Sequence, residues 1–230
     1  MESILLIEDH ASLRQALALM LKEKTGFVVA GQAGTLAEAR ALLGHFDVAI
    51  LDPGLPDGDG LSLIPELHAA NPHRKNSPGC AVLVLTASLD RELFVRAIEA
   101  GAAGFLHKTA GVCEIIDAVR RLCAGEALIS PDEIPNILDL AQRRRGSDPV
   151  TRAAVESLTS REKQVLRTLA DGLNNKEIAR RLGITVQTER NYLSSIFSKL
   201  GVHSRLQALV FAVRHGIVEI PTASTLTKRT

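Results

Sequence analysis

Four short apolar runs in the first half of the chain each lead into an acidic, hydroxyl or basic residue. They cover residues 4–7, 48–51, 82–85 and 104–106. Short apolar runs of this kind, with helical patterns between them, predict a parallel sheet that is buried on both faces, and therefore an α/β fold. In such sheets, ligands bind just outside the carboxyl ends of the strands. We therefore expect the polar residues that follow the runs to meet in one crevice.

The residues expected in this crevice suit a phosphoryl-accepting site, and they are Glu8, Asp9, Asp52, Thr86 and Lys108. Crowded carboxylates need a cation, and their oxygen atoms suit Mg²⁺. An aspartate can attack a phosphoryl group, and Asp52, which precedes the tight loop 53–60, is the best candidate. Lys108 offers a positive charge and Thr86 a hydroxyl group to phosphate oxygens. A protein catalyses phosphoryl transfer mainly by positioning the reacting groups and by neutralising the negative charge of the phosphoryl oxygens.

The same residues, with the sequence Gly-Leu-Pro-Asp-Gly behind Asp52, resemble the receiver domain of bacterial two-component response regulators. The resemblance covers residues 1–125 and implies a flavodoxin-like, doubly wound parallel sheet of five strands. It implies that a sensor histidine kinase phosphorylates Asp52. It further implies that Thr86, Lys108 and Phe105 respond to the phosphate. The ligands that it implies for Mg²⁺ are Glu8, Asp9, Asp52 and the backbone carbonyl of Gly54.

Two residues depart from the receiver pattern. Pro53 follows the acceptor, where a branched apolar residue is common in the family. Because proline favours extended geometry in the residue before it, we expect Asp52 at a strand end to tolerate this proline. Thr109 follows Lys108 where many receivers have proline, and this variation is common in the NarL/FixJ-type branch. Neither departure changes the assignment of the site.

The two ends of the chain carry opposite charge. Residues 1–125 contain 11 basic and 15 acidic residues, residues 126–159 contain 4 and 6, and residues 160–230 contain 12 and 5. The total charge of +1 at pH 7 therefore hides an acidic front and a basic end. A basic terminal domain is the electrostatic feature expected of a nucleic-acid binder.

Three helix patterns follow one another in the basic region. Residues 159–162 carry a capping-box signature for the first helix. Residues 174–177 open a second, short helix, residues 183–184 make a tight turn, and Thr185 caps the third helix. Two helices joined by a short turn that contains glycine predict a helix-turn-helix, whose second helix enters the major groove of DNA.

The third helix has an apolar stripe and an opposite polar face. The stripe contains Leu193, Ile196, Phe197 and Leu200. Residues near the start of a recognition helix usually contact base edges, which makes Gln187, Arg190 and Asn191 the candidates for reading sequence. Ser194 lies on the same polar face. The candidates for holding phosphates are Lys176, Thr185, Thr188, Lys199 and Arg205.

Residues 158–162, 175–179 and 199–202 resemble the LuxR-type DNA-binding domain. The resemblance spans residues 157–220 and implies a domain of four helices. Its last helix, residues 204–215, often supplies a dimer contact in the family. Two roles remain open for the apolar residues of this helix: a dimer surface, or packing within their own domain. These residues are Leu206, Leu209, Val210 and Val213.

Two residues of the third helix depart from the LuxR-type pattern. Glu189 lies on the apolar stripe, where the family usually has valine, and a buried unpaired carboxylate costs several kcal/mol. We expect it to reach solvent, a cation or the start of the helix, where negative charge is tolerated best. Tyr192 stands where the family often has histidine.

The rest of the chain suggests an intracellular protein. Residues 126–156 are expected to form a helix and then a flexible linker that contains the arginine run 143–145, and residues 221–230 a disordered tail. Cys80, Cys113 and Cys123 are odd in number and are expected to be reduced core residues of a cytoplasmic protein. No apolar run reaches the length of a membrane span, and residues 4–7 are expected to form a strand and not a signal peptide.

Together these patterns indicate a transcription factor and not an enzyme. Phosphorylation of Asp52 is expected to shift an equilibrium between receiver states and to control dimerisation and binding to double-stranded DNA. One alternative is a DNA-binding protein whose receiver acts without phosphate. A second alternative is an aspartate-based phosphatase. Such enzymes need a second acidic residue two positions after the nucleophile, where this chain has Gly54.

Overall fold

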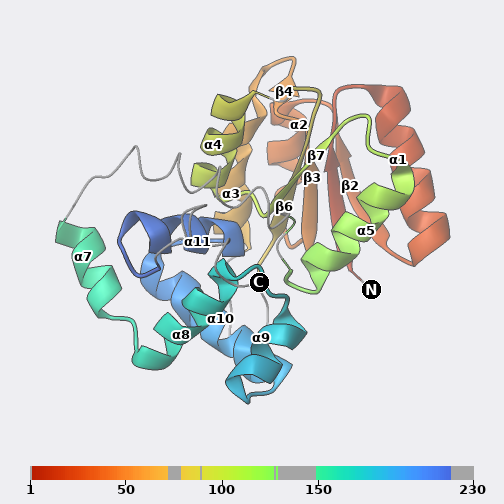
Figure 1. The fold of residues 1–230 in the computed structure, drawn as a ribbon. Coiled ribbons are helices and arrows are strands. Elements are labelled where there is room, and N and C mark those ends of the chain that lie inside the picture. The colour runs from red at the N-terminus through yellow and green to blue at the C-terminus, as the bar shows by residue number, and fades with distance from the viewer. Residues whose placement is uncertain (1, 72–78, 89, 127, 129–148, 219–230) are drawn as a thin grey trace. The chain divides into compact units, whose positions relative to one another are not determined.

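The computed structural model describes residues 2–71, 79–88, 90–126, 128 and 149–218 (Figure 1). The chain divides into two compact units, one made of Met1–Leu128 with Val202–Gln207, the other of Ile129–Gly201 with Ala208–Thr230. The expected tail lies outside the described residues, as does most of the expected linker with its arginine run. Among the helices that the structure describes, none is long and apolar enough to cross a membrane.

A five-stranded parallel sheet forms the centre of the first unit. Its strands are β1 (Ser3–Ile7), β2 (Val28–Ala33), β3 (Val48–Leu51), β6 (Ala81–Thr86) and β7 (Gly104–His107). They lie in the order β2-β1-β3-β6-β7, with all neighbours parallel. This is the order of flavodoxin-like folds, so the predicted fold class is confirmed. The four apolar runs became β1, β3, β6 and β7.

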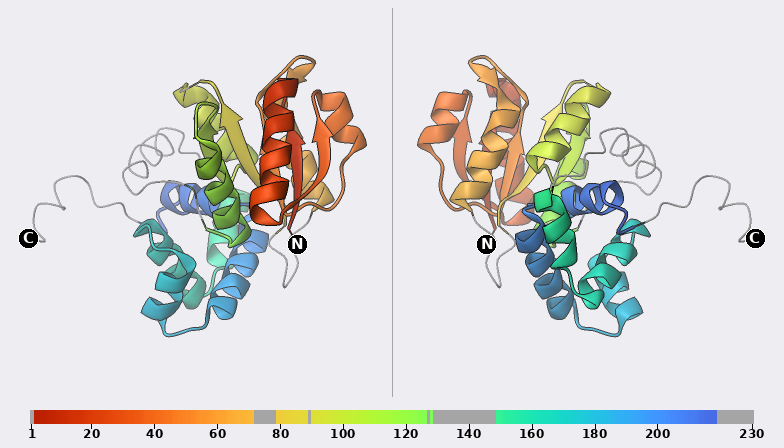
Figure 2. Two further views of the ribbon diagram at one scale, coloured as in Figure 1. Left: turned by 90° about the vertical axis from the view of Figure 1, so that its right-hand side faces the viewer. Right: turned by 90° about the vertical axis from the view of Figure 1, so that its left-hand side faces the viewer.

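Helices cover both faces of this sheet (Figure 2). One face carries α1 (Ala11–Thr25) and α5 (Val112–Cys123), and the other carries α2 (Leu36–Ala41), α3 (Leu63–Ala70) and α4 (Arg91–Ala100).

Because successive side chains of a strand point to opposite faces, the strands contribute alternately to two cores. Leu5 and Ile7 of β1 pack under α2, α3 and α4, whereas Ile4 and Leu6 pack under α1 and α5. Burial on both faces explains why these runs contain no polar residue.

The loop after β3 folds back beside Asp52. It contains a small hairpin of β4 (Gly54–Leu55) and β5 (Gly58–Asp59), followed by the 3₁₀ turn η1 (Gly60–Ser62). Gly60 donates its N–H to the carbonyl of Pro53 at 2.9 Å. Any Cβ atom on Gly60 would lie 2.3 Å from the carbonyl oxygen of Asp52, so only glycine fits there.

The C-terminal part of the chain is helical. It contains α7 (Pro149–Glu156), α8 (Ser160–Ala170), α9 (Asn175–Leu182), α10 (Val186–Leu200) and α11 (Arg205–Arg214). The predicted helices correspond to α8–α11, which confirms the helical second domain. The helix α7 falls within the expected linker.

The predicted helix starts are observed at atomic detail. Thr159 and Glu162 form the capping box of α8, and Thr185 accepts a hydrogen bond from the N–H of Thr188. Asn174 and Glu177 form a second capping box, at α9. Gly183, with φ +64°, ends α9 in the left-handed conformation that glycine adopts without strain, and so makes the turn before α10.

The predicted apolar stripe of α10 is buried, since Leu193, Ile196, Phe197 and Leu200 are each at most 7% exposed. The apolar residues of α11, for which two roles were open, are also buried: Leu206, Leu209, Val210 and Val213. The cysteine prediction was wrong in part, because Cys113 is exposed while Cys80 is buried; all three cysteines are free.

Candidate functional site

Two carboxylates and a lysine meet at the carboxyl end of the sheet. Asp52 follows β3, and its N–H still donates to the carbonyl of Ile7 in the neighbouring strand at 2.8 Å. The Nζ atom of Lys108, which follows β7, lies 2.6 Å from Oδ2 of Asp52 and 2.7 Å from Oε1 of Glu8. The residues that follow the strands therefore do meet in one crevice. Lys108 joins Glu8 to Asp52 there.

Asp9 completes an acidic cluster with these residues. Its Oδ1 atom lies 3.9 Å from Nζ of Lys108. Glu8 and Asp52 are almost completely buried, with side chains 3% and 6% exposed, whereas the side chain of Asp9 is 31% exposed. Three carboxylates thus surround one ammonium group, and the cluster retains an excess of negative charge.

Burial and charge compete in setting the pKa values of this cluster. Burial raises the pKa of Asp52 above its ordinary value, although Lys108 and the N–H of Gly54 favour the charged carboxylate. Burial opposes the charged form of Lys108 as well, but the hydrogen bonds to Asp52 and Glu8 prevail and raise its pKa. The lysine is therefore held as a cation among the carboxylates.

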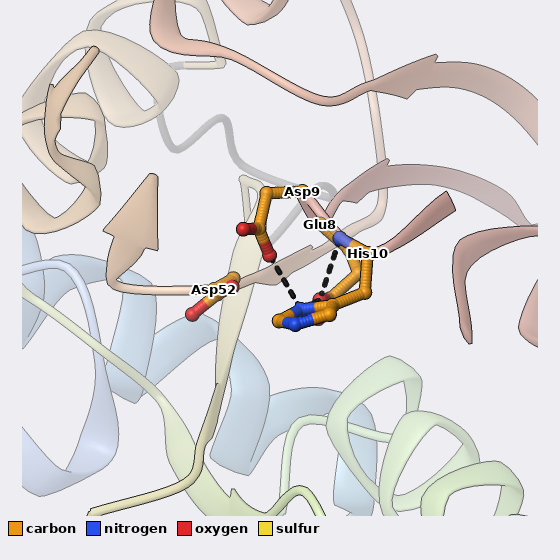
Figure 3. Close-up of side chains that lie close together, drawn as sticks. All are labelled: Glu8, Asp9, His10 and Asp52. Carbon is orange, nitrogen blue, oxygen red and sulfur yellow. Dashed lines mark hydrogen bonds and ion pairs between the residues drawn. The ribbon is translucent and has the colours of Figure 1, made fainter. Parts of the chain in front are cut away.

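Two residues that the sequence analysis did not assign to the site also contact the acidic pair. Arg14 of α1 donates from Nη1 to the backbone carbonyl of Glu8 and, at 3.5 Å, to that of Asp9. The Nδ1 atom of His10 lies 3.0 Å from Oε1 of Glu8 and 2.7 Å from Oδ1 of Asp9 (Figure 3). Their positions in the sequence could have indicated these contacts: His10 directly follows the acidic pair, and Arg14 lies near the start of the next helix.

The donor atoms of this cluster fit a divalent cation. One potential ligand atom from each of Glu8, Asp9, His10 and Asp52 lies within 4.8 Å of the others. The Oε2 atom of Glu8 is buried and makes no hydrogen bond with any described residue. A buried charged oxygen without a partner is costly, and a cation can satisfy it.

The other three residues assigned to this site lie as follows. Gly54 donates its N–H to Oδ1 of Asp52 at 2.9 Å. The hydroxyl of Thr86 accepts a hydrogen bond from the N–H of Ser88 at 3.0 Å and so binds within its own loop. The half-buried ring of Phe105 packs on Phe94 of α4, with ring centroids 4.1 Å apart.

The face of α10 expected to meet nucleic acid is polar and solvent-accessible. Gln187, Arg190 and Asn191 are exposed, and Gln187 donates from Nε2 to Oδ1 of Asn191 at 3.3 Å. Ser194 is half-buried on the next turn. Exposed amide and guanidinium groups at the start of a helix are the groups that read base edges in the major groove.

The five predicted phosphate contacts differ in exposure. Lys176 and Thr185 are exposed and Thr188 is half-buried; Thr185 and Thr188 also share a hydroxyl–hydroxyl hydrogen bond of 2.8 Å. Lys199 is bound to Glu162 inside the domain, and Arg205 is only 6% exposed. Lys176 and Thr185 are thus the most open of the five, Thr188 and Lys199 are half-buried, and Arg205 is buried.

A network around Glu162 joins α8 to α10. Lys199 donates to both carboxylate oxygens, at 2.9 and 2.7 Å, and the hydroxyl of Ser195 donates to Oε1 at 2.6 Å. The N–H of Thr159 donates to Oε2 at 2.7 Å. Burial alone would raise the pKa of Glu162, but these hydrogen bonds lower it to about 2. The sequence analysis had assigned Glu162 only to a helix cap.

Glu189 is completely buried, at 0% exposure. It therefore does not reach solvent, which was one of the three expectations for it. It lies in the first turn of α10, where the partial positive charge of the helix start favours a carboxylate.

Comparison with known proteins gives matches to both halves of the chain. Residues 4–120 match the family model of the response regulator receiver domain. Residues 156–212 match that of the bacterial regulatory proteins of the luxR family.

Two relatives match over almost the whole length of both chains. The DNA-binding transcriptional activator DevR/DosR of Mycobacterium tuberculosis is 34% identical over 92% of this chain and 94% of its own length. The response regulator protein VraR of Staphylococcus aureus is 28% identical over 94% and 98%. A crystal structure of a LuxR-family two-component response regulator from Aurantimonas sp. SI85-9A1 aligns with a TM-score of 0.50 at 23% identity, covering 60% of this chain and 96% of that one, and so agrees in fold.

Proposed function

Because this chain belongs to the two-component response regulators that join a receiver domain to a luxR-type DNA-binding domain, we propose that phosphorylation of Asp52 controls its binding to DNA. The observation that carries the proposal is the position of Asp52, a buried carboxylate at a strand end that contacts Lys108 beside two further acids. The phosphoryl donor is a sensor histidine kinase. One carboxylate oxygen of Asp52 forms the new bond to phosphorus as the bond between phosphorus and the histidine nitrogen breaks.

In the acidic cluster Mg²⁺ would be held by Glu8, Asp9, Asp52 and the backbone carbonyl of Gly54. When bound, the ion neutralises negative charge on the carboxylates and on the phosphoryl oxygens. Lys108 binds a phosphoryl oxygen with its ammonium group and keeps its positive charge throughout, because its pKa is raised. The N–H of Gly54, already bonded to Asp52, orients the carboxylate for attack.

Phosphorylation changes the contacts of Lys108 and Thr86. The new dianionic group competes with Glu8 for Lys108, and it attracts the hydroxyl of Thr86 away from Ser88. Movement of Thr86 opens space beside Phe105, whose ring packs on α4. These shifts favour a second receiver state, which is the bistable element that a phosphorylation switch requires.

The output is binding of double-stranded DNA by α10. Gln187, Arg190 and Asn191 read base edges, with Ser194 beside them, and Lys176, Thr185 and Thr188 hold phosphates. Lys199 and Arg205 have a smaller direct part, because the first is engaged by Glu162 and the second is buried. In the phosphorylated state two chains form a homodimer and occupy half-sites about one helical turn of DNA apart.

The proposal is tested by DNA binding with and without phosphorylation. Wild type and Asp52→Asn are each titrated into a duplex selected from a random-sequence library, with and without a small phosphodonor and Mg²⁺. We expect the donor to increase the affinity of wild type only. Equal affinity of both proteins under all conditions would instead support a DNA-binding protein that acts without phosphate.

A second pair of variants separates base reading from phosphate contact. Arg190→Ala should cost about 1–3 kcal/mol on the selected duplex and relax its sequence preference. Lys176→Ala should weaken binding to all duplexes alike and reduce its salt dependence. If the two variants lose affinity in the same way, α10 does not read sequence through Arg190.

A further inference from the structure

His10 points its ring at the acidic cluster and not at the helix that it precedes. It is the N-cap residue of α1, but its side chain makes no capping hydrogen bond. Its Nδ1 atom instead lies within 3.0 Å of Glu8 and 2.7 Å of Asp9, as Figure 3 shows. Since Asn, Asp, Ser and Thr are the residues favoured for capping, the local helix gives no reason for a histidine here.

A second observation indicates that this arrangement is incomplete without a ligand. Oε2 of Glu8 is buried, and among the described residues it has no hydrogen-bond partner. The opposite oxygen of the same carboxylate already contacts both Lys108 and His10. A cation placed in the cluster would satisfy the free oxygen and would lie within reach of the imidazole nitrogen, because all four potential ligand atoms are within 4.8 Å of one another.

We propose that His10 supplies a nitrogen ligand to this metal site, so that the site prefers a later transition metal such as Co²⁺ or Ni²⁺ over Mg²⁺. The inference rests on the proposed function, which places a divalent cation among the same carboxylates. Sites made only of oxygen atoms suit Mg²⁺, whereas imidazole nitrogen favours later divalent ions of the first transition series. The geometry supports this choice because Nδ1 already lies beside two carboxylates that face the site.

The position of His10 also suits entry and exit of the ion. Its side chain is 67% exposed, while Glu8 and Lys108 are 3% and 14% exposed. The nitrogen ligand therefore lies at the open rim of the cluster, and Lys108 lies on the inner side. The ring can turn onto an arriving ion without any rearrangement of the core.

The test compares metal affinities of the full chain, purified without a histidine tag. His10→Ser is the variant of choice, because serine is a good N-cap residue and preserves the start of α1. His45→Gln is the matched control: His45 is exposed in the loop before β3, at the opposite end of the sheet. Binding of Mg²⁺, Ni²⁺ and Co²⁺ is measured by titration calorimetry, and a variant with Asp9→Asn and Asp52→Asn defines binding by histidines elsewhere.

We expect His10→Ser to weaken Ni²⁺ and Co²⁺ binding at the cluster about tenfold or more, and to leave Mg²⁺ binding nearly unchanged. His45→Gln should behave as wild type for all three ions. Equal loss for Mg²⁺ and Ni²⁺, or no loss for either, would overturn the proposal while leaving the Mg²⁺ site in place. Absence of binding of any of the three ions to wild type would overturn the metal site itself as well.

A spectroscopic measurement identifies the ligand directly. Pulsed electron paramagnetic resonance of the Mn²⁺-loaded protein detects a coupled ¹⁴N nucleus when imidazole nitrogen is coordinated. We expect this coupling in wild type and in His45→Gln, and its loss in His10→Ser. Mn²⁺ bound to wild type without nitrogen coupling would contradict the assignment of His10.

Discussion

The receiver and the DNA-binding domain each bury a carboxylate that binds a lysine, but the hydrogen-bonding capacity of the two carboxylates is satisfied to different degrees. In the DNA-binding domain, both oxygens of Glu162 accept hydrogen bonds, from Lys199, Ser195 and Thr159. In the receiver, Lys108 faces three carboxylates, and Oε2 of Glu8 has no partner among the described residues.

This difference separates a structural contact from a binding site. A saturated network holds two helices at a defined geometry and has no capacity for a further ligand. A cluster with excess negative charge and a free buried oxygen is stabilised by a cation, and it changes when a phosphoryl group brings new charge. A lysine bound to a carboxylate thus holds α10 in place in the DNA-binding domain. In the receiver, the same kind of contact can still change when a cation or a phosphoryl group binds.

The largest effect is expected from breaking the saturated network. Glu162→Ala leaves Lys199 and Ser195 without their acceptor and should lower the free energy of unfolding of the DNA-binding domain by about 3 kcal/mol. Glu177→Ala is the matched control, because Glu177 holds the equivalent capping-box position of α9 and accepts from the N–H of Asn174, with no lysine bound to it among the described residues. It should cost about 1 kcal/mol. Chemical denaturation of the full chain measures both, and equal losses would contradict a special role for the Lys199 network.

Acid should weaken the same network gradually. The pKa of Glu162 is lowered in the folded protein from 4.5 to about 2. Its contribution to stability is therefore fully present above pH 4.5 and is lost as the pH falls toward 2. Thermal melts between pH 6 and 3 should show a steeper loss of stability for wild type than for Glu162→Gln. Parallel curves for the two proteins would show that this carboxylate has no shifted pKa.

Removing the lysine of the open cluster should have a smaller and metal-dependent effect. In Lys108→Ala the three carboxylates lose their cation, so without divalent ions the receiver should be destabilised by about 2 kcal/mol. Addition of Mg²⁺ should then raise the melting temperature more in this variant than in wild type. The exposed Lys22 of α1 provides the control substitution. If Mg²⁺ does not reduce the loss of stability, Lys108 stabilises the receiver by packing against its neighbours and not by neutralising the three carboxylates.

The smallest effect is expected from removing one excess charge. The pKa of Asp9 is lowered, although burial opposes this, because contacts with Asp52 and the charges of His10 and Lys108 favour the carboxylate. Asp9→Asn removes these contacts and should destabilise the metal-free receiver slightly, by less than about 1 kcal/mol, because the side chain is partly exposed. The same change removes a proposed ligand and should weaken Mg²⁺ binding strongly. Thermal melting measures the loss of stability and calorimetry the loss of Mg²⁺ affinity; unchanged Mg²⁺ affinity would contradict the role of Asp9 as a ligand.

The sequence revealed those features that depend on neighbouring residues or on the general rules of parallel sheets. The buried strands were evident as apolar runs, and the caps at Thr159 and Thr185 follow from local spacing. Five strands were expected, but the residues of β2 were not identified, because this strand lies at an edge and its residues alternate between half-buried and exposed over most of its length. The meeting of Asp52 and Lys108 followed from the rule that strand ends share one edge.

Contacts between distant segments that do not follow strand ends were not predictable from the sequence. Lys199 reaches Glu162 across 37 residues, and Asp57 accepts the N–H groups of Leu36 and Ala37 from 20 residues away or more. No local pattern specifies which polar groups of two packed helices or loops will face each other. For the same reason Lys199 was assigned to DNA from its charge alone, while its partner within the domain remained hidden.

The most direct test of the open cluster is the mass of the intact protein after incubation with a small phosphodonor. Wild type, Asp52→Asn and Asp57→Asn are each treated with and without Mg²⁺. We predict that wild type and Asp57→Asn gain the mass of one phosphoryl group in the presence of Mg²⁺, and that Asp52→Asn gains none. A phosphoryl group on Asp52→Asn, or none on wild type with Mg²⁺ present, would contradict the assignment of Asp52 as the acceptor.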